Sequence, residues 1–265
     1  MKNQIRKIAF VLASTDHGTM ILNRFDYRMV NSNKGFGVGY QLLERSAFDS
    51  VEVETVLSLL PLRRKYFGDG IVAIDCGANI GVHTIEWAKK MSGWGSVIAI
   101  EAQERIYYAL AGNIAINNCF NARAILAAAS AQTGTMKIPW PNYLKPASFG
   151  SLELKKRSKN EFIGQAIDYD EKKAIGVRAL TLDSLLLPRV DLIKIDVEGM
   201  ELEVLEGAMR SIKKSLPLLI VESIKIDKTQ LRKRLEALGY RTFKLGLNIL
   251  AAHENDKTAA HIKLK

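Results

Sequence analysis

The chain has 265 residues, 48% of them hydrophobic and 25% charged, which fits one globular α/β domain with a sizeable core and some additions. No apolar run approaches the roughly 20 residues of a membrane-spanning helix, and Cys76 and Cys119 are too few for a disulfide framework, so a reducing cytoplasm is expected. The net charge of +10 favours an anionic partner (nucleic acid, an acidic glycan or a membrane surface) or serves solubility alone.

Residues 1–47 predict a β-rich N-terminal extension, because KIAFVL and TMILNRFDY read as strands and NKGFGVGY reads as a glycine-rich loop. The apolar core of residues 8–13 is short for a signal peptide, so a first strand is favoured. Residues 48–67 predict a helical pair broken near Pro61.

The most informative segment is DCGANIG, residues 75–81, between an apolar run and an amphipathic stretch that predicts a helix over residues 82–91. We expect Gly77 to let the backbone approach a ligand, Asn79 to adopt the left-handed region, and Gly81 to let the helix pack on the strand. A nicotinamide site shows G-x-G-x-x-G at this place, and this turn does not. A strand followed by an acid, one residue and a glycine is typical of an S-adenosylmethionine site, whose ligand is cationic.

Further short apolar runs predict parallel strands covered on both faces, at residues 97–100, 124–129, 191–196 and 218–222. Four of the five runs end in an acid: Asp75, Glu101, Asp196 and Glu222. Because ligands of such sheets bind at the carboxyl ends of the strands, these carboxylates are expected to surround a cationic ligand. An acid in the place of Glu101 accepts the ribose hydroxyls of an adenosine.

The second half of the chain predicts an insertion and a closing hairpin. Residues 132–181 are too long for a plain crossover, so we interpret them as an acceptor-side insertion or, alternatively, a disordered surface loop. Within them, residues 134–140 and 176–181 are expected to pair as added strands. A helix is predicted over 228–238, strands over 240–245 and 247–252, a frayed segment after His253, and a basic tail over 257–265.

The amino-acid sequence of several segments resembles that of the FkbM family of S-adenosylmethionine-dependent methyltransferases. DCGANIG is similar to its first turn, IEAQ (residues 100–103) to its second-strand motif with Gln103 where a proline is usual, and TLDSL followed by DLIKIDVEGMELEVLEGA (residues 191–208) to its signature. The resemblance covers roughly residues 70–222 and implies a seven-stranded Rossmann-like class I methyltransferase sheet, mostly parallel with one antiparallel strand, with helices on both faces. The methyltransferase domain is expected over residues 48–256. The resemblance also implies S-adenosyl-L-methionine as cofactor and methyl transfer to a hydroxyl of a sugar, glycan or natural product.

A hydroxyl acceptor needs a base, and Asp196 is the first candidate. Glu198 is either part of the site or a partner of the dipole of a helix predicted over residues 199–211. Lys194 lies in an apolar strand and needs a carboxylate, for which Glu222 is expected, in a structural or supporting role. His83 faces the cofactor or simply packs in the first turn of its helix.

The catalytic set is therefore predicted as Asp196, Glu198, Lys194 and Glu222. The predicted cofactor-binding residues are Asp75, Gly77, Ala78, Asn79, Gly81, His83, Glu101, Ala102, Ala129 and Asp196. Glu201 lies on the helix surface or near the site. Asp196, Glu198 and Glu222 offer hard oxygen ligands but no diagnostic metal spacing, so no metal is predicted.

Two other functions stay open. The positive charge is compatible with an RNA ribose 2'-O-methyltransferase, although no nucleic-acid motif accompanies it. A non-catalytic cofactor-binding protein is the third hypothesis, and a nicotinamide oxidoreductase is a distant fourth. The acceptor, the metal dependence and the oligomeric state are left open by the sequence.

Overall fold

A computed structural model describes residues 6–31 and 34–262. The chain divides into two compact units: a small unit (Met1–Phe48 and Lys137–Ile175) and a sheet unit (Asp49–Met136 and Gly176–Lys265). The first five residues of the predicted extension, residues 32–33, and the last three of the predicted basic tail lie outside the described residues.

The sheet unit is built on a seven-stranded sheet in which only β14 runs antiparallel to its neighbours. In spatial order the strands are β13 (Tyr240–Leu245), β14 (Asn248–His253), β12 (Leu218–Glu222), β11 (Leu192–Ile195), β5 (Ile71–Cys76), β6 (Gly95–Glu101) and β7 (Ala122–Leu126). The strand order reverses between β11 and β5, which places a ligand-binding crevice at the carboxyl ends of these strands. The predicted fold class is confirmed.

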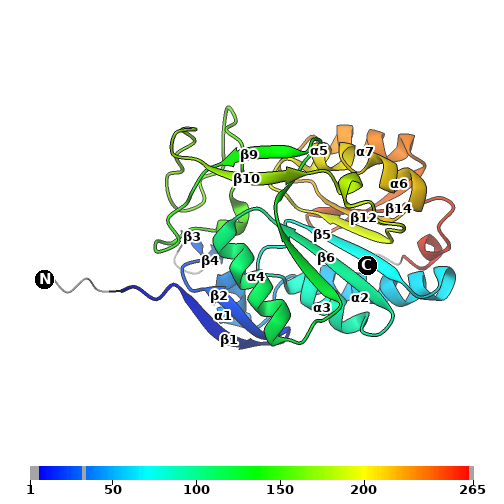
Figure 1. The fold of residues 1–265 in the computed structure, drawn as a ribbon, viewed down its shortest axis with the longest axis horizontal. Helices are drawn as coiled ribbons and strands as arrows, with labels where there is room; N and C mark the ends of the chain where they lie inside the picture. Colours follow the sequence, from blue (N-terminus) through cyan, green and yellow to red (C-terminus); the bar gives the residue numbers. More distant parts are fainter. Residues whose placement is uncertain (1–5, 32–33, 263–265) are drawn as a thin grey trace, which may run out of the picture. The chain divides into compact units, whose positions relative to one another are not determined.

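Helices cover both faces of this sheet, as Figure 1 shows. One side carries α2 (Ser50–Phe67), α3 (Val82–Lys90) and α4 (Glu104–Ile116), and the other carries α5 (Glu201–Glu206), α6 (Met209–Ser215) and α7 (Lys228–Ala237). Short 3-10 turns lie at η2 (Leu182–Leu185) and η3 (Lys257–His261). Because the central strands are covered twice, Ile74, Ile193 and Leu219 are fully buried, which explains the continuous apolar runs in the sequence.

The predicted break at Pro61 is wrong, because α2 is one continuous helix that contains this proline. Proline removes a single backbone donor from a helix interior. The buried face formed by Val56, Leu60 and Arg63 continues across the proline, and its packing holds the helix together.

The helix predicted over residues 199–211 is instead two short helices, α5 and α6. At Gly207, where α5 ends, a Cβ atom would lie 2.1 Å from the Ser130 carbonyl oxygen, so the chain approaches a neighbouring backbone closely. The Asp183 carboxylate then accepts hydrogen bonds from the backbone amides of Arg210 (2.8 Å) and Ser211 (2.7 Å), which starts the second helix.

The run predicted as one strand over residues 124–129 divides between two sheets. After β7, the chain leaves the main sheet, and β8 (Ala128–Ala129) pairs in parallel with β10 (Ile175–Leu180). The small sheet has the order β8–β10–β9, with β9 at Gly134–Ile138. The predicted pairing of the two added strands is therefore confirmed.

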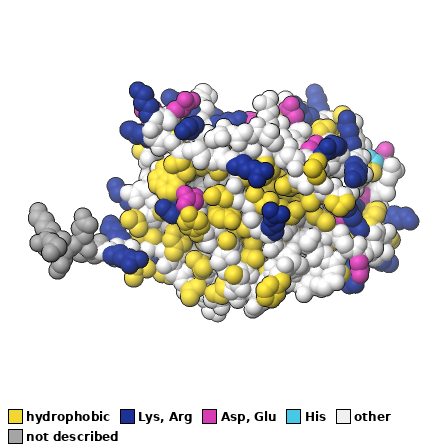
Figure 2. Space-filling model, in the orientation of Figure 1, with side chains coloured by type: hydrophobic (Ala, Val, Ile, Leu, Met, Phe, Trp, Pro, Cys, Tyr) yellow, Lys and Arg dark blue, Asp and Glu magenta, His cyan; other side chains and the backbone are white. Residues whose placement is uncertain are grey.

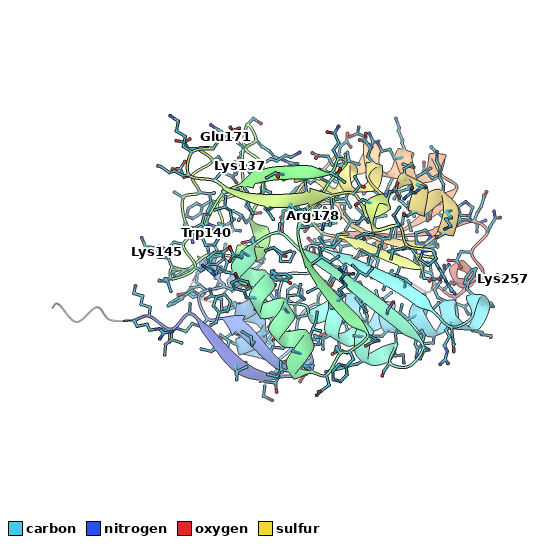
Figure 3. All side chains as sticks on the ribbon, in the orientation of Figure 1. Lys137, Trp140, Lys145, Glu171, Arg178 and Lys257 are labelled. Atoms are coloured by element: carbon cyan, nitrogen blue, oxygen red, sulfur yellow. The ribbon has the colours of Figure 1, made fainter. Side chains whose placement is uncertain are left out.

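The small unit joins the N-terminal segment to the segment between β9 and β10. Its N-terminal part forms two hairpins, β1 (Phe10–Thr15) with β2 (Gly18–Asn23) and β3 (Arg28–Asn31) with β4 (Lys34–Phe36), followed by α1 (Val38–Arg45). The glycine-rich loop expected at NKGFGVGY is thus β4 and the start of α1. Its other part contains the 3-10 turn η1 (Phe149–Ser151) and carries Trp140, labelled in Figure 3, whose ring meets Tyr143 edge-on at 5.5 Å.

The segment after β14 is held in place rather than frayed. Asp256 is buried, and its Oδ2 accepts a hydrogen bond from Arg63 Nη1 at 2.8 Å. Its Oδ1 accepts the backbone amide of Thr258 at 2.8 Å at the start of η3. A buried ion pair therefore ties the segment to α2, a contact that the polar and basic sequence did not reveal.

Candidate functional site

The turn after β5 brings the ends of three strands together. The amides of Gly77 and Ala78 both donate to the Ile100 carbonyl at the end of β6, at 2.9 and 3.0 Å. Gly77 has φ 76°, and a Cβ atom there would lie 1.8 Å from the Asp196 carbonyl oxygen. Glycine at 77 is therefore required by the approach of the chain after β11, whereas the sequence suggested approach of a ligand.

The other residues of the turn adopt the conformations that their types allow. Asn79 has φ 51°, as expected from its position. Gly81 has φ 92°, and a Cβ atom there would lie 2.6 Å from Leu110 Cδ1. Gly81 thus permits close packing on α4, not on a strand as predicted. Ala78, at the centre of the turn, is buried.

Asp75 is the one charged residue of β5, lies next to its last residue, and is almost completely buried. Its Oδ2 accepts a hydrogen bond from the Thr84 hydroxyl at 2.6 Å. Its Oδ1 is buried and has no hydrogen-bond partner within the described part of the chain. Burial raises the pKa of this carboxyl, and the charge of Lys194 acts in the opposite direction. Asp75 is thus a buried acceptor with unused capacity.

Glu101 fastens the turn from the neighbouring strand β6. Its Oε2 accepts the Asn79 amide at 3.0 Å, and its Oε1 accepts the Gln103 amide at 2.8 Å. Burial raises the pKa of Glu101 to about 7, and these backbone hydrogen bonds act in the opposite direction. Ala102 follows it and is buried, while Ala129 is buried in β8 of the small sheet.

The predicted partner of Lys194 is wrong. Lys194 Nζ donates to Asp196 Oδ2 at 2.7 Å. Side chains alternate along a strand, so residues 194 and 196 share a face, and the register of Ile195 with Val221 puts Glu222 level with Asp196 instead. Burial opposes the charge of Lys194, but Asp196, Glu52 and Asp75 outweigh it and raise the pKa of the ammonium.

Three of the predicted catalytic carboxylates do meet. One oxygen each from Asp196, Glu198 and Glu222 lies within 4.8 Å of the others. Burial, reinforced by the charge of Asp196, raises the pKa of Glu198 to about 8 and that of Glu222 to about 9. Glu198 also forms an ion pair with Lys225. These groups form a cluster of closely spaced acids at one end of β11 and β12.

Glu201, whose place the sequence left open, is completely buried beneath this cluster's loop. Its Oε1 accepts the backbone amides of Gly199 at 2.9 Å and Val197 at 3.2 Å. It shapes the turn in which Glu198 adopts φ 56°. Its role is therefore structural support of the loop that presents Glu198.

Sequence reasoning missed two acids of this region, Asp49 before α2 and Glu52 in its first turn. Glu52 is 2% exposed, its Oε1 lies 3.5 Å from His83 Nε2, and the Asn248 side-chain amide donates to its Oε2. Burial raises the pKa of Glu52 to about 7, against the effect of Lys194. The one available signal for Glu52 was a carboxylate at helical spacing from Val56, Leu59 and Leu60, on the face of α2 that is buried.

The expectations on positive charge and on membrane-spanning segments can be compared with the surface and the helices. On the face drawn in Figure 2, basic side chains stand singly or in small groups among hydrophobic ones. The small unit holds 15 Lys and Arg against eight Asp and Glu, a net charge of +7, so most of the net charge of +10 of the sequence belongs to it. Among the described helices, none is both long and apolar enough to cross a membrane.

Comparison with known proteins gives matches to methyltransferases. The family model described as "Methyltransferase FkbM domain" matches residues 75–242. The methyltransferase sdnD of Sordaria araneosa is 31% identical over 153 residues, which are 51% of this chain and 59% of that protein.

Two solved structures resemble the chain at low identity. One is the methyltransferase FkbM from Methylobacillus flagellatus KT, with TM-score 0.47, 18% identity, and coverage of 71% of this chain and 46% of that one. The other is magnesium protoporphyrin IX methyltransferase from Synechocystis PCC 6803 with bound SAM, with TM-score 0.44, 13% identity, and coverage of 78% and 80%. The chain spans less than two thirds of the length of sdnD and of the Methylobacillus protein.

Proposed function

Because the chain belongs to the FkbM methyltransferase domain family, we propose that it is an S-adenosylmethionine-dependent methyltransferase acting on a hydroxyl of a sugar, glycan or natural product. The observation that carries the proposal is the set of acids at the ends of four adjacent strands, β12, β11, β5 and β6. A cationic ligand is the chemistry that such an edge favours.

The residues fit that cofactor. Asp75 offers a buried oxygen with no hydrogen-bond partner among the described residues, and Glu101 is held in place by two backbone amides. We assign the cofactor to the turn of Asp75, Gly77, Ala78, Asn79 and Gly81, together with Glu101, Ala102, Ala129 and Asp196. When bound, the cofactor supplies a methyl group activated by the positive charge of its sulfur.

The reaction requires the chain to position a hydroxyl and to take its proton. We assign proton acceptance to Asp196, oriented by Lys194 at 2.7 Å, with Glu198 and Glu222 beside it. Burial raises the pKa of Glu198 to about 8 and that of Glu222 to about 9, so these two carboxyls hold their protons more firmly than ordinary ones and stand beside Asp196 as hydrogen-bond donors.

We also propose that residues 48–256 form the catalytic domain and that residues 132–181 select the acceptor. Long insertions between sheet elements are usually functional when they are ordered. This insertion is ordered over much of its length: Asn160 Nδ2 donates to Glu153 Oε2 at 2.9 Å, and the Tyr169 hydroxyl donates to the Glu153 carbonyl at 3.0 Å.

The experiment is transfer of a labelled methyl group from S-adenosylmethionine to a panel of glycans, sugars and hydroxylated natural products. Asp196→Asn should reduce the rate by about 100-fold or more, as loss of a general base does. The control is Asp227→Asn, which alters only the cap of α7, where Oδ1 accepts the Thr229 amide at 2.8 Å. An unchanged rate in Asp196→Asn removes the assignment, and transfer to RNA alone replaces the acceptor class.

A further inference from the structure

A second group of side chains that can bind a metal ion, two carboxylates and an imidazole, lies near the strand-end acids. Asp49, the residue before α2, and Glu52, in its first turn, approach His83 in the first turn of α3. One ligand atom from each of these three residues lies within 4.8 Å of the other two. The group combines an imidazole with two carboxylates and belongs wholly to the sheet unit.

The contact between Glu52 and His83 is poorly explained as a hydrogen bond. The distance from Glu52 Oε1 to His83 Nε2 is 3.5 Å, which exceeds the usual range for a nitrogen–oxygen hydrogen bond. Glu52 Oε1 is buried and accepts no hydrogen bond from any described residue. The other oxygen, Oε2, accepts the side-chain amide of Asn248, which fixes the carboxylate with Oε1 toward the imidazole.

The spacing matches two ligands of one metal ion. Nitrogen and oxygen ligands that each lie about 2.1 Å from a tetrahedral Zn²⁺ are about 3.4 Å apart. The Glu52–His83 distance of 3.5 Å agrees with this value. Asp49 is exposed, so a third ligand stands at the solvent side, where an ion can enter. Three protein ligands leave a coordination position open for water or a substrate oxygen.

The donor set selects the class of metal. Imidazole with carboxylates suits Zn²⁺ and other first-row transition metals, whereas Mg²⁺ and Ca²⁺ prefer oxygen ligands alone. Lys194 lies near enough to Glu52 to affect its charge, but its ammonium donates to Asp196 and not to this group. The all-carboxylate cluster of Asp196, Glu198 and Glu222 lacks an imidazole and is therefore the weaker candidate for such a metal.

We propose that Asp49, Glu52 and His83 form a binding site for one divalent transition-metal ion, of which Zn²⁺ is the model. The charge of Asp196 contributes to raising the pKa of both Asp49 and Glu52, so the two carboxyls lie near Asp196. An ion bound by them therefore lies close to the region assigned to the acceptor. Binding of the metal does not depend on the methyl-transfer proposal, and it is tested without any measurement of activity.

The test is calorimetric titration of the metal-free full chain with Zn²⁺, together with the visible absorption of Co²⁺ as a reporter of imidazole ligation. We expect one Zn²⁺ per chain. His83→Asn, Glu52→Gln and Asp49→Asn should each weaken binding by about tenfold or more. His83→Asn should also change the Co²⁺ spectrum. Circular dichroism establishes that each variant is folded. Because Asp49 is exposed to solvent, Asp49→Asn is the variant whose folding should be affected least.

Two matched variants separate this site from other metal-binding groups. His261→Asn removes an exposed imidazole, and Glu222→Gln weakens the all-carboxylate cluster; neither should change the affinity for Zn²⁺. The proposal is overturned by absence of Zn²⁺ binding, by binding that the three site variants leave unchanged, or by binding lost in Glu222→Gln or His261→Asn.

Discussion

At the residue scale, one buried cation serves several acids. Lys194 makes its hydrogen bond to Asp196, and its charge also reaches Asp75 and Glu52. Because one ammonium cannot balance all of these buried carboxyls, some of them keep their protons to higher pH, as the pKa of about 9 for Glu222 indicates. A bound cation supplies the missing positive charge, so we expect cofactor binding to release protons.

This excess of buried acids predicts the pH dependence of stability. Burial, followed by the charge of Asp196, raises the pKa of Glu222 from 4.5 to about 9, so between these values the folded protein holds a proton that the unfolded chain releases. This contribution to stability is complete below pH 4.5 and is lost as the pH rises through about 9. The free energy of unfolding, from urea titrations of the ligand-free protein, should therefore fall with pH across this window.

Glu222→Gln should flatten that fall by at most about 1.4 kcal/mol per pH unit. Glu236→Gln, an exposed position on α7, is the control and should leave the slope unchanged. A slope that is equal in both variants and in the parent protein would show that Glu222 is ionised in the fold.

Gly77 gives a second prediction at this scale. In Gly77→Ala the new Cβ would lie 1.8 Å from the Asp196 carbonyl oxygen at φ 76°, so strain and overpacking act together. In Gly93→Ala the backbone has φ 80° but nothing lies within 4 Å, so only the conformational cost of about 1–2 kcal/mol remains. Thermal unfolding should show Gly77→Ala less stable than Gly93→Ala by about 1–3 kcal/mol. Equal stabilities would mean that the β5 turn and the β11 end are not in close contact.

At the scale of elements, α2 is fixed to the sheet by a buried ion network. Arg63 donates to Asp191 Oδ1 at 2.9 Å and to Asp256 Oδ2 at 2.8 Å, and all three side chains are buried. Asp191 also accepts from Arg189 at 2.8 Å and from the backbone amide of Val72 at 3.0 Å. Since α2 also carries Glu52, this network holds part of the functional region in position.

Removal of the central cation should be costly. Arg63→Met leaves the Asp256 carboxylate buried without its cation, for which we expect a loss of about 3–5 kcal/mol in the free energy of unfolding. Arg64→Met, which breaks an exposed pair with Asp69 (2.6 Å), is the control and should change stability little. Denaturant titration measures both, and similar small losses would contradict the buried network.

The sequence predicted the strands better than the helices and their partners. Strand ends were visible where an apolar run stops at an acid, as at Asp75 and Glu222, whereas the run over residues 124–129 has no such acid and its division between two sheets was missed. The division of a helix at Gly207 depends on the Ser130 carbonyl, which is far away in the sequence. Glu52 was missed for the same reason, because its partners Asn248 and His83 come from other elements. The catalytic and cofactor assignments remain predictions.

At the scale of the whole molecule, the small unit is assembled from two distant segments around one buried acid. Asp26 Oδ2 accepts the Gly39 amide and its Oδ1 accepts the Phe149 amide, both at 2.9 Å. The Asn23 side chain donates to the Tyr143 carbonyl at 3.0 Å, and Asp26 bridges to Ala147. The N-terminal extension and most of the insertion therefore form one unit, whereas the sequence analysis predicted two separate additions.

Asp26→Asn should loosen this junction. An asparagine presents an amide group to one of the two backbone donors, and a buried donor without an acceptor costs about 1–3 kcal/mol. Hydrogen exchange should accelerate at the Gly39 or Phe149 amide and remain unchanged in the central strands of the sheet. Asp16→Asn, at an exposed position of the same unit, should alter neither amide. Unchanged exchange in Asp26→Asn would show that other contacts hold the two segments together.

The most direct test of the whole account is a calorimetric titration of the full chain with S-adenosylhomocysteine, the demethylated product of the cofactor. We predict one site per chain, and a loss of affinity of about tenfold or more in Glu101→Ala, which removes the carboxylate assigned to the ribose. An absence of binding to the parent protein, or equal affinity in Glu101→Ala, would contradict the assignment of the strand-end acids to this cofactor.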